Sequence, residues 1–170
     1  MKIDYFNTFI EESTCKILFD FAVNMQNGFV KTSNKHRKIS GSLILPKESI
    51  SIQKKLINLY SNICQITPMV YWHKGIMCSI MEPKSEMPVH LDSNYKKDGL
   101  SVVSFNLLVS ESNLENNVTV EDQQYFMKTG DMMAYLITDY HHGVYNVTEN
   151  APRVMWYWRF YVDKKIWENR

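Results

Sequence analysis

The sequence contains few cysteines, no secretory signal and no long apolar run. Its cysteines, Cys15, Cys64 and Cys78, are scattered and form no CxxC pair, so the spacing of a zinc site or of a disulfide framework is absent. No stretch approaches the roughly 20 apolar residues that span a bilayer. The first residues lack the apolar segment and the small-residue cleavage site of a secretory signal. These absences predict a soluble, cytoplasmic protein with reduced thiols and no membrane partner.

An excess of charge of one sign is also missing. The 170 residues carry 19 lysines and arginines against 18 aspartates and glutamates, for a formal net charge of +1. No general positive field therefore favours nucleic acid or an anionic membrane. Apolar residues make up 45% and charged residues 22%, which is typical of one globular domain and excludes wholesale disorder. Arginine is scarce, and the four arginines are Arg37, Arg153, Arg159 and Arg170.

Two helices are predicted in the first part of the chain. The first spans Glu11–Met25, with Gly28 as a stop signal just past its end. The second spans Pro46–Cys64, and Thr67-Pro68 ends it. Each has an apolar face at helical spacing, formed by Cys15, Leu18, Phe19 and Val23 in the first helix and by Ile52, Leu56, Leu59, Tyr60 and Ile63 in the second.

After residue 68 the pattern changes to short β-strands separated by turns. The candidate strands are Met69–Ile80, Val89–Asp92, Leu100–Val109, Val118–Glu121, Gln124–Met127, Met132–Ile137, Gly143–Val147 and Arg153–Val162. Such strands with no helix between them are typical of a sandwich or barrel, and the two helices would cover one of its sheets. The sequence thus predicts a mainly β fold, a jelly roll buttressed by N-terminal helices. It predicts one domain over residues 1–170, with 1–68 as helical support and 69–163 as the β core.

A metal site is predicted from His90 and Asp92. In a strand, residues i and i+2 project from the same face, so this imidazole and this carboxylate can serve one cation. A histidine on a later strand, in the pair His141-His142, would complete a two-histidine, one-carboxylate face. That face is typical of non-haem Fe(II) oxygenases and leaves metal positions open for a 2-oxo acid and for dioxygen. Taken alone, a His-x-Asp triplet is more often a surface loop, so the downstream order carries the argument.

Arg153 follows the histidine pair after one short connection. Arginine is the best bidentate partner of a carboxylate, so this scarce residue is a candidate for binding the far end of a dicarboxylate. The alternative is a structural ion pair at the end of the barrel.

The run from Ser85 to Phe160 resembles the Fe(II)/2-oxoglutarate-dependent oxygenase superfamily. The resemblance rests on four elements in the family's order: Pro88-Val89-His90-Leu91-Asp92, Gly130-Asp131 before a strand, His142-Gly143-Val144, and Arg153. The N-terminal part, with Ile3-Asp4-Tyr5-Phe6 and the helices after it, resembles the prolyl-4-hydroxylase-like branch.

This resemblance implies a double-stranded β-helix that holds Fe(II) through His90, Asp92 and His142, with His141 on the opposite face. It implies that Arg153 binds 2-oxoglutarate, a co-substrate used together with O2. Where the prolyl-hydroxylase-like branch often has a tyrosine before its His-x-Asp triplet, this chain reads Ser79-Ile80-Met81. Asn106 is the candidate for a polar cofactor contact, and its alternative is a buried asparagine bonded to the backbone.

The predicted function is therefore an Fe(II)/2-oxoglutarate-dependent dioxygenase that hydroxylates an amino acid or a residue in a peptide or protein. Related halogenases have a small residue at the carboxylate position, so Asp92 favours hydroxylation. One alternative is an oxidative nucleic-acid demethylase, since Arg153 and Arg159 are six residues apart as in that branch. The near-zero net charge disfavours nucleic acid. The other alternative is a non-oxidative, cupin-like metal-binding domain or isomerase.

Three polar loops are candidates for the mouth of the substrate pocket, namely Lys31–Gly41, Ser93–Gly99 and Glu111–Asn117. The first contains the basic run Lys35-His36-Arg37-Lys38. Such a run is usually a solvated loop, and its alternative role is contact with phosphate or with an acidic substrate.

Overall fold

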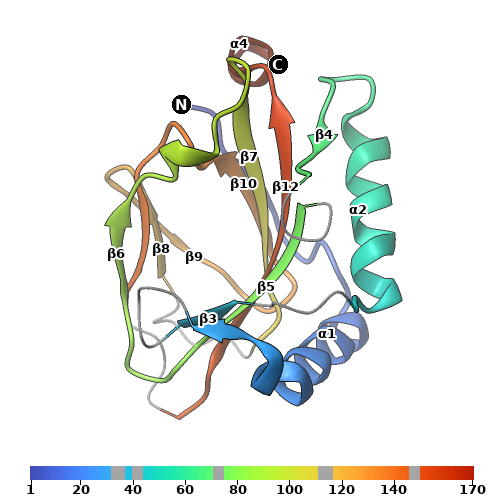
Figure 1. The fold of residues 1–170 in the computed structure, drawn as a ribbon, viewed down its shortest axis with the longest axis vertical. Helices are drawn as coiled ribbons and strands as arrows, with labels where there is room; N and C mark the ends of the chain where they lie inside the picture. The colour runs from blue at the N-terminus through green and yellow to red at the C-terminus, as the bar shows by residue number, and fades with distance from the viewer. Residues whose placement is uncertain (32–36, 40–43, 71–74, 111–116, 146–149) are drawn as a thin grey trace.

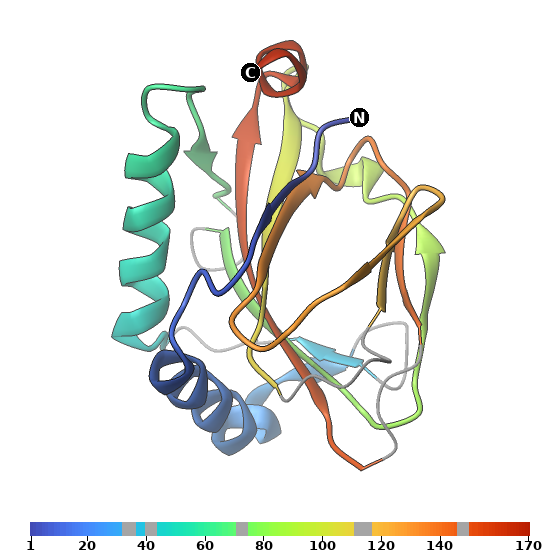
Figure 2. The same ribbon diagram turned by 180° about the vertical axis from the view of Figure 1, so that it is seen from behind.

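The computed structural model of the chain describes residues 1–31, 37–39, 44–70, 75–110, 117–145 and 150–170. Two antiparallel sheets face each other (Figures 1 and 2). The larger sheet has the strand order β1 (Asp4–Phe6), β10 (Met132–Leu136), β7 (Ser101–Leu108), β12 (Arg153–Val162), β5 (Ile76–Met81), β3 (Arg37–Ile39) and β2 (Val30–Lys31), with β4 (Thr67–Pro68) also paired to β12. The smaller sheet has the order β6 (Met87–His90), β11 (His142–Tyr145), β8 (Asn117–Val120) and β9 (Gln123–Phe126).

This architecture confirms the predicted fold class, a jelly-roll double-stranded β-helix with N-terminal helices. Helices α1 (Glu12–Met25) and α2 (Lys47–Tyr60) cover the outer side of the larger sheet, away from the smaller one (Figures 1 and 2). Both form where periodic apolar residues meet that sheet, and the buried positions are Cys15, Leu18 and Ala22 in α1 and Ser49, Ile52, Leu56 and Tyr60 in α2. No helix in the described part of the chain is long and apolar enough to cross a membrane.

The predicted apolar face of the second helix is too wide. Leu59 and Ile63 are 45% and 47% exposed, because α2 ends at Tyr60 and turns only one narrow stripe toward the sheet. Two tryptophans of β12 fix the helices in place: Trp156 Nε1 donates to the Leu18 carbonyl at 3.2 Å and Trp158 Nε1 to the Ser49 carbonyl at 2.8 Å.

The first part of the chain also supplies strands that sequence reasoning did not predict. β1 pairs with β10, and β3 pairs with β5 and β2. The turn before β10 anchors β1: the Asp131 carboxylate accepts hydrogen bonds from the Thr8 amide at 2.9 Å and from the Tyr5 hydroxyl at 2.8 Å. The last helix, α4 (Lys164–Asn169), was also not predicted; it begins after Asp163, whose carboxylate caps two of its amides. Both chain ends lie at the same end of the molecule (Figures 1 and 2).

Strand β12 is buried along its whole length and has two chemically distinct faces. Because side chains alternate along a strand, its even-numbered tryptophans face the helices. Its odd-numbered residues, Arg153, Met155, Tyr157 and Arg159, all line a cavity on the other face. The strand thus brings two of the four arginines of the chain to one site.

Candidate metal centre

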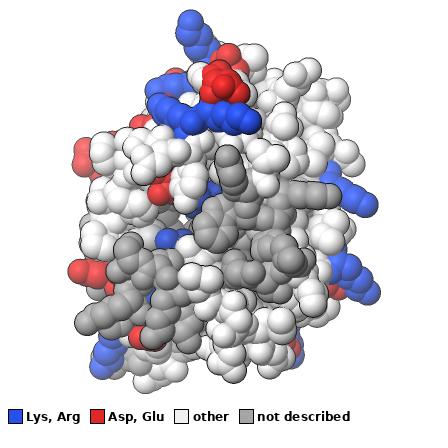
Figure 3. Space-filling model, viewed as in Figure 1, with Lys and Arg blue, Asp and Glu red and all other residues white. Residues whose placement is uncertain are grey.

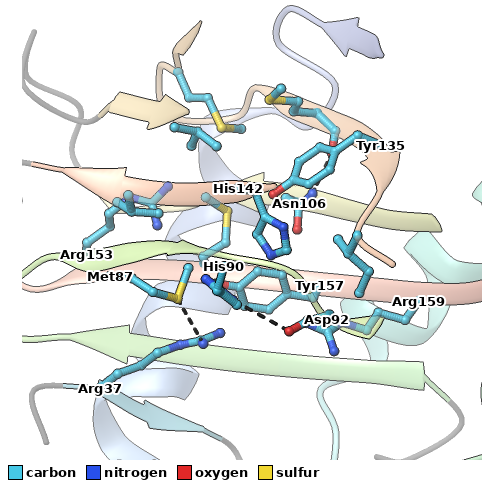
Figure 4. Close-up of a pocket in the computed structure, with 16 residues that line it drawn as sticks. Arg37, Met87, His90, Asp92, Asn106, Tyr135, His142, Arg153, Tyr157 and Arg159 are labelled. Carbon is cyan, nitrogen blue, oxygen red and sulfur yellow. Dashed lines mark hydrogen bonds and ion pairs between the residues drawn. The ribbon is translucent and has the colours of Figure 1, made fainter. Parts of the chain in front are cut away.

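A cavity lined by side chains from both sheets lies between them, and Figure 4 shows the residues that form it. His90 from β6, His142 from β11 and Asp92 each offer one ligand atom, and these atoms lie within 4.8 Å of one another. The two histidines are direct cross-strand neighbours, and their ring centres are 4.4 Å apart. The Asp92 carboxylate lies 3.5 Å from His90 Nε2. In the described residues, this is the one cluster of three such groups.

Both imidazoles have the same nitrogen committed to the backbone. His90 Nδ1 lies 2.9 Å from the Pro88 carbonyl oxygen, and His142 Nδ1 lies 3.1 Å from the Tyr140 carbonyl oxygen. A carbonyl only accepts, so each Nδ1 carries a proton, and each Nε2 is the ring nitrogen that is left to face the cluster. Metal-binding histidines are usually oriented in this way by a backbone or carboxylate acceptor.

His142 is in the form that a metal requires. Burial lowers its pKa to about 4, and the neighbouring His90 acts in the same direction, against the hydrogen bond to Tyr140. The imidazole is therefore neutral at neutral pH and needs to lose no proton before it binds a cation. The adjacent His141 is exposed and lies 3.7 Å from Glu121, outside the cluster. The structure thus places His142, and not His141, beside His90 and Asp92.

Asp92 reaches the cluster differently from the way the sequence argument assumed. β6 ends at His90, and Asp92 lies beyond it, at φ −84° and ψ 41°, just before the short 3-10 helix η2 (Ser93–Tyr95). The predicted strand Val89–Asp92 is therefore wrong at its end. The Asp92 amide donates to the Ile137 carbonyl at 3.1 Å. The residue that follows β10 therefore holds this turn, and a paired strand does not.

Arg153 lies at one end of the cavity (Figure 4) and is only 2% exposed. Its Nε and Nη2 atoms are buried without a hydrogen-bond partner, and burial lowers the pKa of this guanidinium. The Tyr157 hydroxyl, which shares a 2.8 Å hydrogen bond with Ser79, lies on the same face of β12. A buried cation with unused donors is unfavourable by itself, so this end of the cavity is suited to an anion.

Asn106 also lines the cavity, but its amide is largely used by the sheet. Its Nδ2 donates to the Ser104 and Met133 carbonyls, both at 3.0 Å, and its Oδ1 accepts from the Ser104 hydroxyl at 2.9 Å. These bonds are what the alternative interpretation, a buried backbone-bonded asparagine, requires. The predicted cofactor contact of Asn106 remains a prediction, with its donor hydrogens already engaged.

Two further arginines line the cavity. From the sequence, Arg37 was placed in a candidate pocket-mouth loop and Arg159 was cited for the nucleic-acid alternative, but neither was named as a site residue. Arg37 enters from β3, with Nη1 3.2 Å from the Met87 sulfur and its guanidinium carbon 5.7 Å from the centre of the Tyr157 ring. Arg159 lies at the other end of β12 from Arg153, with Nη2 3.1 Å from Asp92 Oδ2. The sequence feature that could have indicated them is the scarcity of arginine, because three of the four arginines line this one cavity.

Parts of the predicted pocket mouth fall outside the described residues. These parts are residues 32–36, 40–41 and 111–116, which include Lys35 and His36 of the basic run. The second predicted loop, Ser93–Gly99, is described, and the centre of its Tyr95 ring is 5.2 Å from the Arg159 guanidinium carbon.

No protein-family model matches the sequence, and no curated protein matches it. Solved structures do resemble the fold. A viral collagen prolyl hydroxylase from Paramecium bursaria chlorella virus 1, in complex with 2-oxoglutarate, has a TM-score of 0.71 at 11% identity, over 94% of this chain and 96% of that one. A prolyl hydroxylase from Trichoplax adhaerens, in complex with a hypoxia-inducible-factor peptide, has a TM-score of 0.71 at 14% identity, over 98% and 86%.

A third similar structure is HygX from Streptomyces hygroscopicus with nickel, 2-oxoglutarate and hygromycin B bound. Its TM-score is 0.68 at 9% identity, over 94% of this chain and 82% of that one. At these identities the likeness shows the fold: the chain has the double-stranded β-helix of the Fe(II)/2-oxoglutarate oxygenases. The predicted resemblance to that superfamily is confirmed at this level.

Proposed function

We propose that the protein is an Fe(II)/2-oxoglutarate-dependent dioxygenase of the hydroxylase type. The observation that carries the proposal is the presence of two halves of one site in one cavity. One half is the His90, Asp92 and His142 cluster, and the other is the buried, incompletely bonded Arg153. Two imidazoles and one carboxylate form a donor set suited to Fe(II) that leaves metal positions open.

The residues of the cavity suit the co-substrate as well. 2-Oxoglutarate is a dianion with a carboxylate at each end, and the guanidinium of Arg153 offers Nε and Nη2 to the end that lies away from the metal. When bound, the Fe(II) centre supplies the oxidising chemistry in which O2 and 2-oxoglutarate become succinate and CO2 while a hydroxyl group enters the substrate. The chain itself orients the ligand imidazoles, neutralises the dianion and excludes water from the reacting atoms.

The substrate is proposed to be an amino acid or a residue in a peptide. The similar structures support either a peptide or a small molecule as substrate, since one contains a peptide and another contains hygromycin B. The whole chain, residues 1–170, is proposed to act as one domain in which residues 69–163 form the catalytic core and residues 1–68 support it. The presence of Asp92, rather than a small residue, supports hydroxylation.

Anaerobic reconstitution tests this proposal. With Fe(II) and then 2-oxoglutarate, the wild type is expected to develop a weak visible metal-to-ligand charge-transfer band, because both groups bind in one cavity. His142→Ala should abolish the band, since it removes a ligand of the cluster. His141→Ala is the matched control and should retain the band, since His141 is exposed and lies beside Glu121.

Two outcomes would contradict the proposal. A folded, iron-loaded wild type that gives no band would favour a non-oxidative metal-binding domain or an isomerase. A band that survives His142→Ala but is lost in His141→Ala would reverse the assignment of the ligand histidine.

A further inference from the structure

The cavity contains a second cationic end that 2-oxoglutarate does not use. Arg153 and Arg159 lie on the same face of β12, six residues apart, which corresponds to roughly 20 Å along a strand. They lie on opposite sides of the His90, Asp92 and His142 cluster (Figure 4). A five-carbon diacid that joins the metal to Arg153 therefore extends away from Arg159.

Arg159 is held in place but incompletely bonded. The residue is only 6% exposed. Its guanidinium carbon lies 5.2 Å from the centre of the Tyr95 ring and 5.9 Å from that of Tyr157. Nη2 donates to Asp92 at 3.1 Å, while Nε is buried without a hydrogen-bond partner. A guanidinium has five N–H donors, so this rigid, buried group has donors left for another acceptor.

Charge within the cavity points in the same direction. Among the described residues, the lining of the cavity includes the guanidinium groups of Arg153 and Arg159 and a single carboxylate, Asp92. Fe(II) adds two positive charges and 2-oxoglutarate two negative ones, so the positive excess of the lining persists after both have bound. Asp92 would also have to bind the metal and pair with Arg159 at the same time. A buried cation whose only carboxylate partner also binds a metal is unfavourable unless a further anion joins it.

We propose that the substrate is a small molecule with an anionic group, a carboxylate or a phosphate, and that Arg159 binds this group beside the metal. This inference rests on the proposed function, whose substrate class it narrows. A guanidinium at this depth binds an anion that enters the cavity. The phosphates of a nucleic-acid backbone would stay outside it, and on the face in Figure 3 the described lysines and arginines are interspersed with acidic side chains.

The experiment uses the anaerobic Fe(II) protein saturated with 2-oxoglutarate, so that Arg153 is already occupied. The probes are amino acids, free and N-acetylated, each compared as the carboxylate and as its primary amide, together with phosphoserine compared with serine. A short single-stranded oligonucleotide is included. Binding is read from the change that each probe makes in the charge-transfer band, and turnover in air from succinate release.

For at least one pair, the anionic member should bind the wild type about tenfold or more tightly than its neutral partner, the size of one charge-assisted hydrogen bond. Arg159→Gln should reduce that preference to near unity, and the affinity for 2-oxoglutarate is measured in parallel because Arg159 also contacts Asp92. Arg170→Gln is the matched control; Arg170 pairs with Asp4 outside the cavity and should retain the preference.

Several results would overturn the inference. The first is a panel in which no anion is preferred, and the second is a preference that survives Arg159→Gln. A third is preferential, salt-dependent binding of the oligonucleotide. Arg159→Lys keeps a charge beside Asp92, so loss of the band in both Arg159 variants would show that Arg159 only positions Asp92. A missing band in the wild type would instead count against the proposed function.

Discussion

At the scale of single residues, backbone carbonyls decide which nitrogen each histidine presents. Pro88 and Tyr140 hold the Nδ1 atoms of His90 and His142, so both rings are oriented before a metal arrives. Pre-orientation reduces the conformational entropy that binding would otherwise cost. The ligand set therefore depends on two carbonyl groups that no side-chain motif records.

Arg153→Met gives a prediction with effects in opposite directions. The change removes a buried guanidinium whose Nε and Nη2 have no partner, so the ligand-free protein should be at least as stable as the wild type. The affinity for 2-oxoglutarate should fall by about a hundredfold, because a charge-assisted pair is lost. Urea unfolding without ligand and titration of the charge-transfer band measure the two effects.

Arg170→Met is the control with the reverse pattern. Arg170 donates to Asp4 at 3.1 and 2.7 Å, so its loss should lower the free energy of unfolding by about 1–3 kcal/mol and leave 2-oxoglutarate affinity unchanged. If Arg153→Met lost stability and kept its affinity, Arg153 would be a structural cation.

The sequence predicted part of the site at this scale. The order His90, Asp92, His142 and Arg153 sufficed to name four side chains that the fold brings into one cavity. Arg37 and Arg159 were not predicted as site residues because their position depends on strand pairing between distant segments. Arg37 lies in a basic run and Arg159 lies among aromatic residues of a strand. The sequence around each of them does not indicate that the two share a cavity.

At the scale of elements, β11 and β6 approach each other closely because Gly143 of β11, which faces β6, has no side chain. A Cβ at this position would lie 2.9 Å from the Met87 carbonyl oxygen and 3.1 Å from the Val89 amide nitrogen. The register between the two strands also shifts at this residue, between His142 and Val144. The separation of the two ligand histidines therefore depends on a residue that has no side chain.

Gly143→Ala should weaken metal binding without touching a ligand. The added methyl group would push β6 away from β11 and so move His90 relative to His142, and we expect a loss of about 1–3 kcal/mol in stability. Fe(II) affinity should fall by about tenfold or more, since ligand geometry is coupled to binding. Fe(II) titration and urea unfolding measure both effects.

Gly28→Ala is the control for that substitution. A Cβ at Gly28 meets no atom within 4 Å, so the change should leave both metal affinity and stability near wild-type values. Equal effects of the two substitutions would contradict the close-approach argument.

Long periodic elements were the predictable ones. The two helices were expected at Glu11–Met25 and Pro46–Cys64, and α1 and α2 span Glu12–Met25 and Lys47–Tyr60. Strands β1, β2 and β3 have three residues or fewer. Segments this short show no measurable alternation, and their strand state is set by partners far away in the chain.

At the scale of the whole molecule, Asp139 joins three separate segments. Its carboxylate binds Lys96 at 2.8 Å near η2, Lys164 at 3.2 Å in α4, and the neighbouring Thr138 hydroxyl. Burial by itself would raise the pKa of Asp139, but these hydrogen bonds and one from Ser101 outweigh it and hold the pKa well below its usual range.

Asp139 should therefore make stability depend on acidity. Because the pKa is lower in the folded state than the value near 3.9 of an unfolded chain, the carboxylate stabilises the fold above about pH 4. This contribution is lost as the pH falls further, through the folded-state pKa. Asp139→Asn should cost about 1–2 kcal/mol at pH 7, discounted because both lysines are half exposed.

The measurement is urea unfolding of the wild type and Asp139→Asn at pH 7 and at pH 3. The difference between the two proteins should shrink as the pH falls. A difference that stayed constant or grew in acid would show that neutral hydrogen bonds, rather than the charge of Asp139, hold the three segments together.

The two faces of strand β12 have different roles. Its even-numbered tryptophans bond to α1 and α2, while its odd-numbered residues carry the charges of the cavity. Substitutions on the cavity face can therefore be selected without changing the face that packs against the helices. Among descendants of one ancestral gene that took up new substrates, positions 155, 157 and 159 should diverge while Trp156 and Trp158 persist, so that specificity changes and the ability to fold is retained.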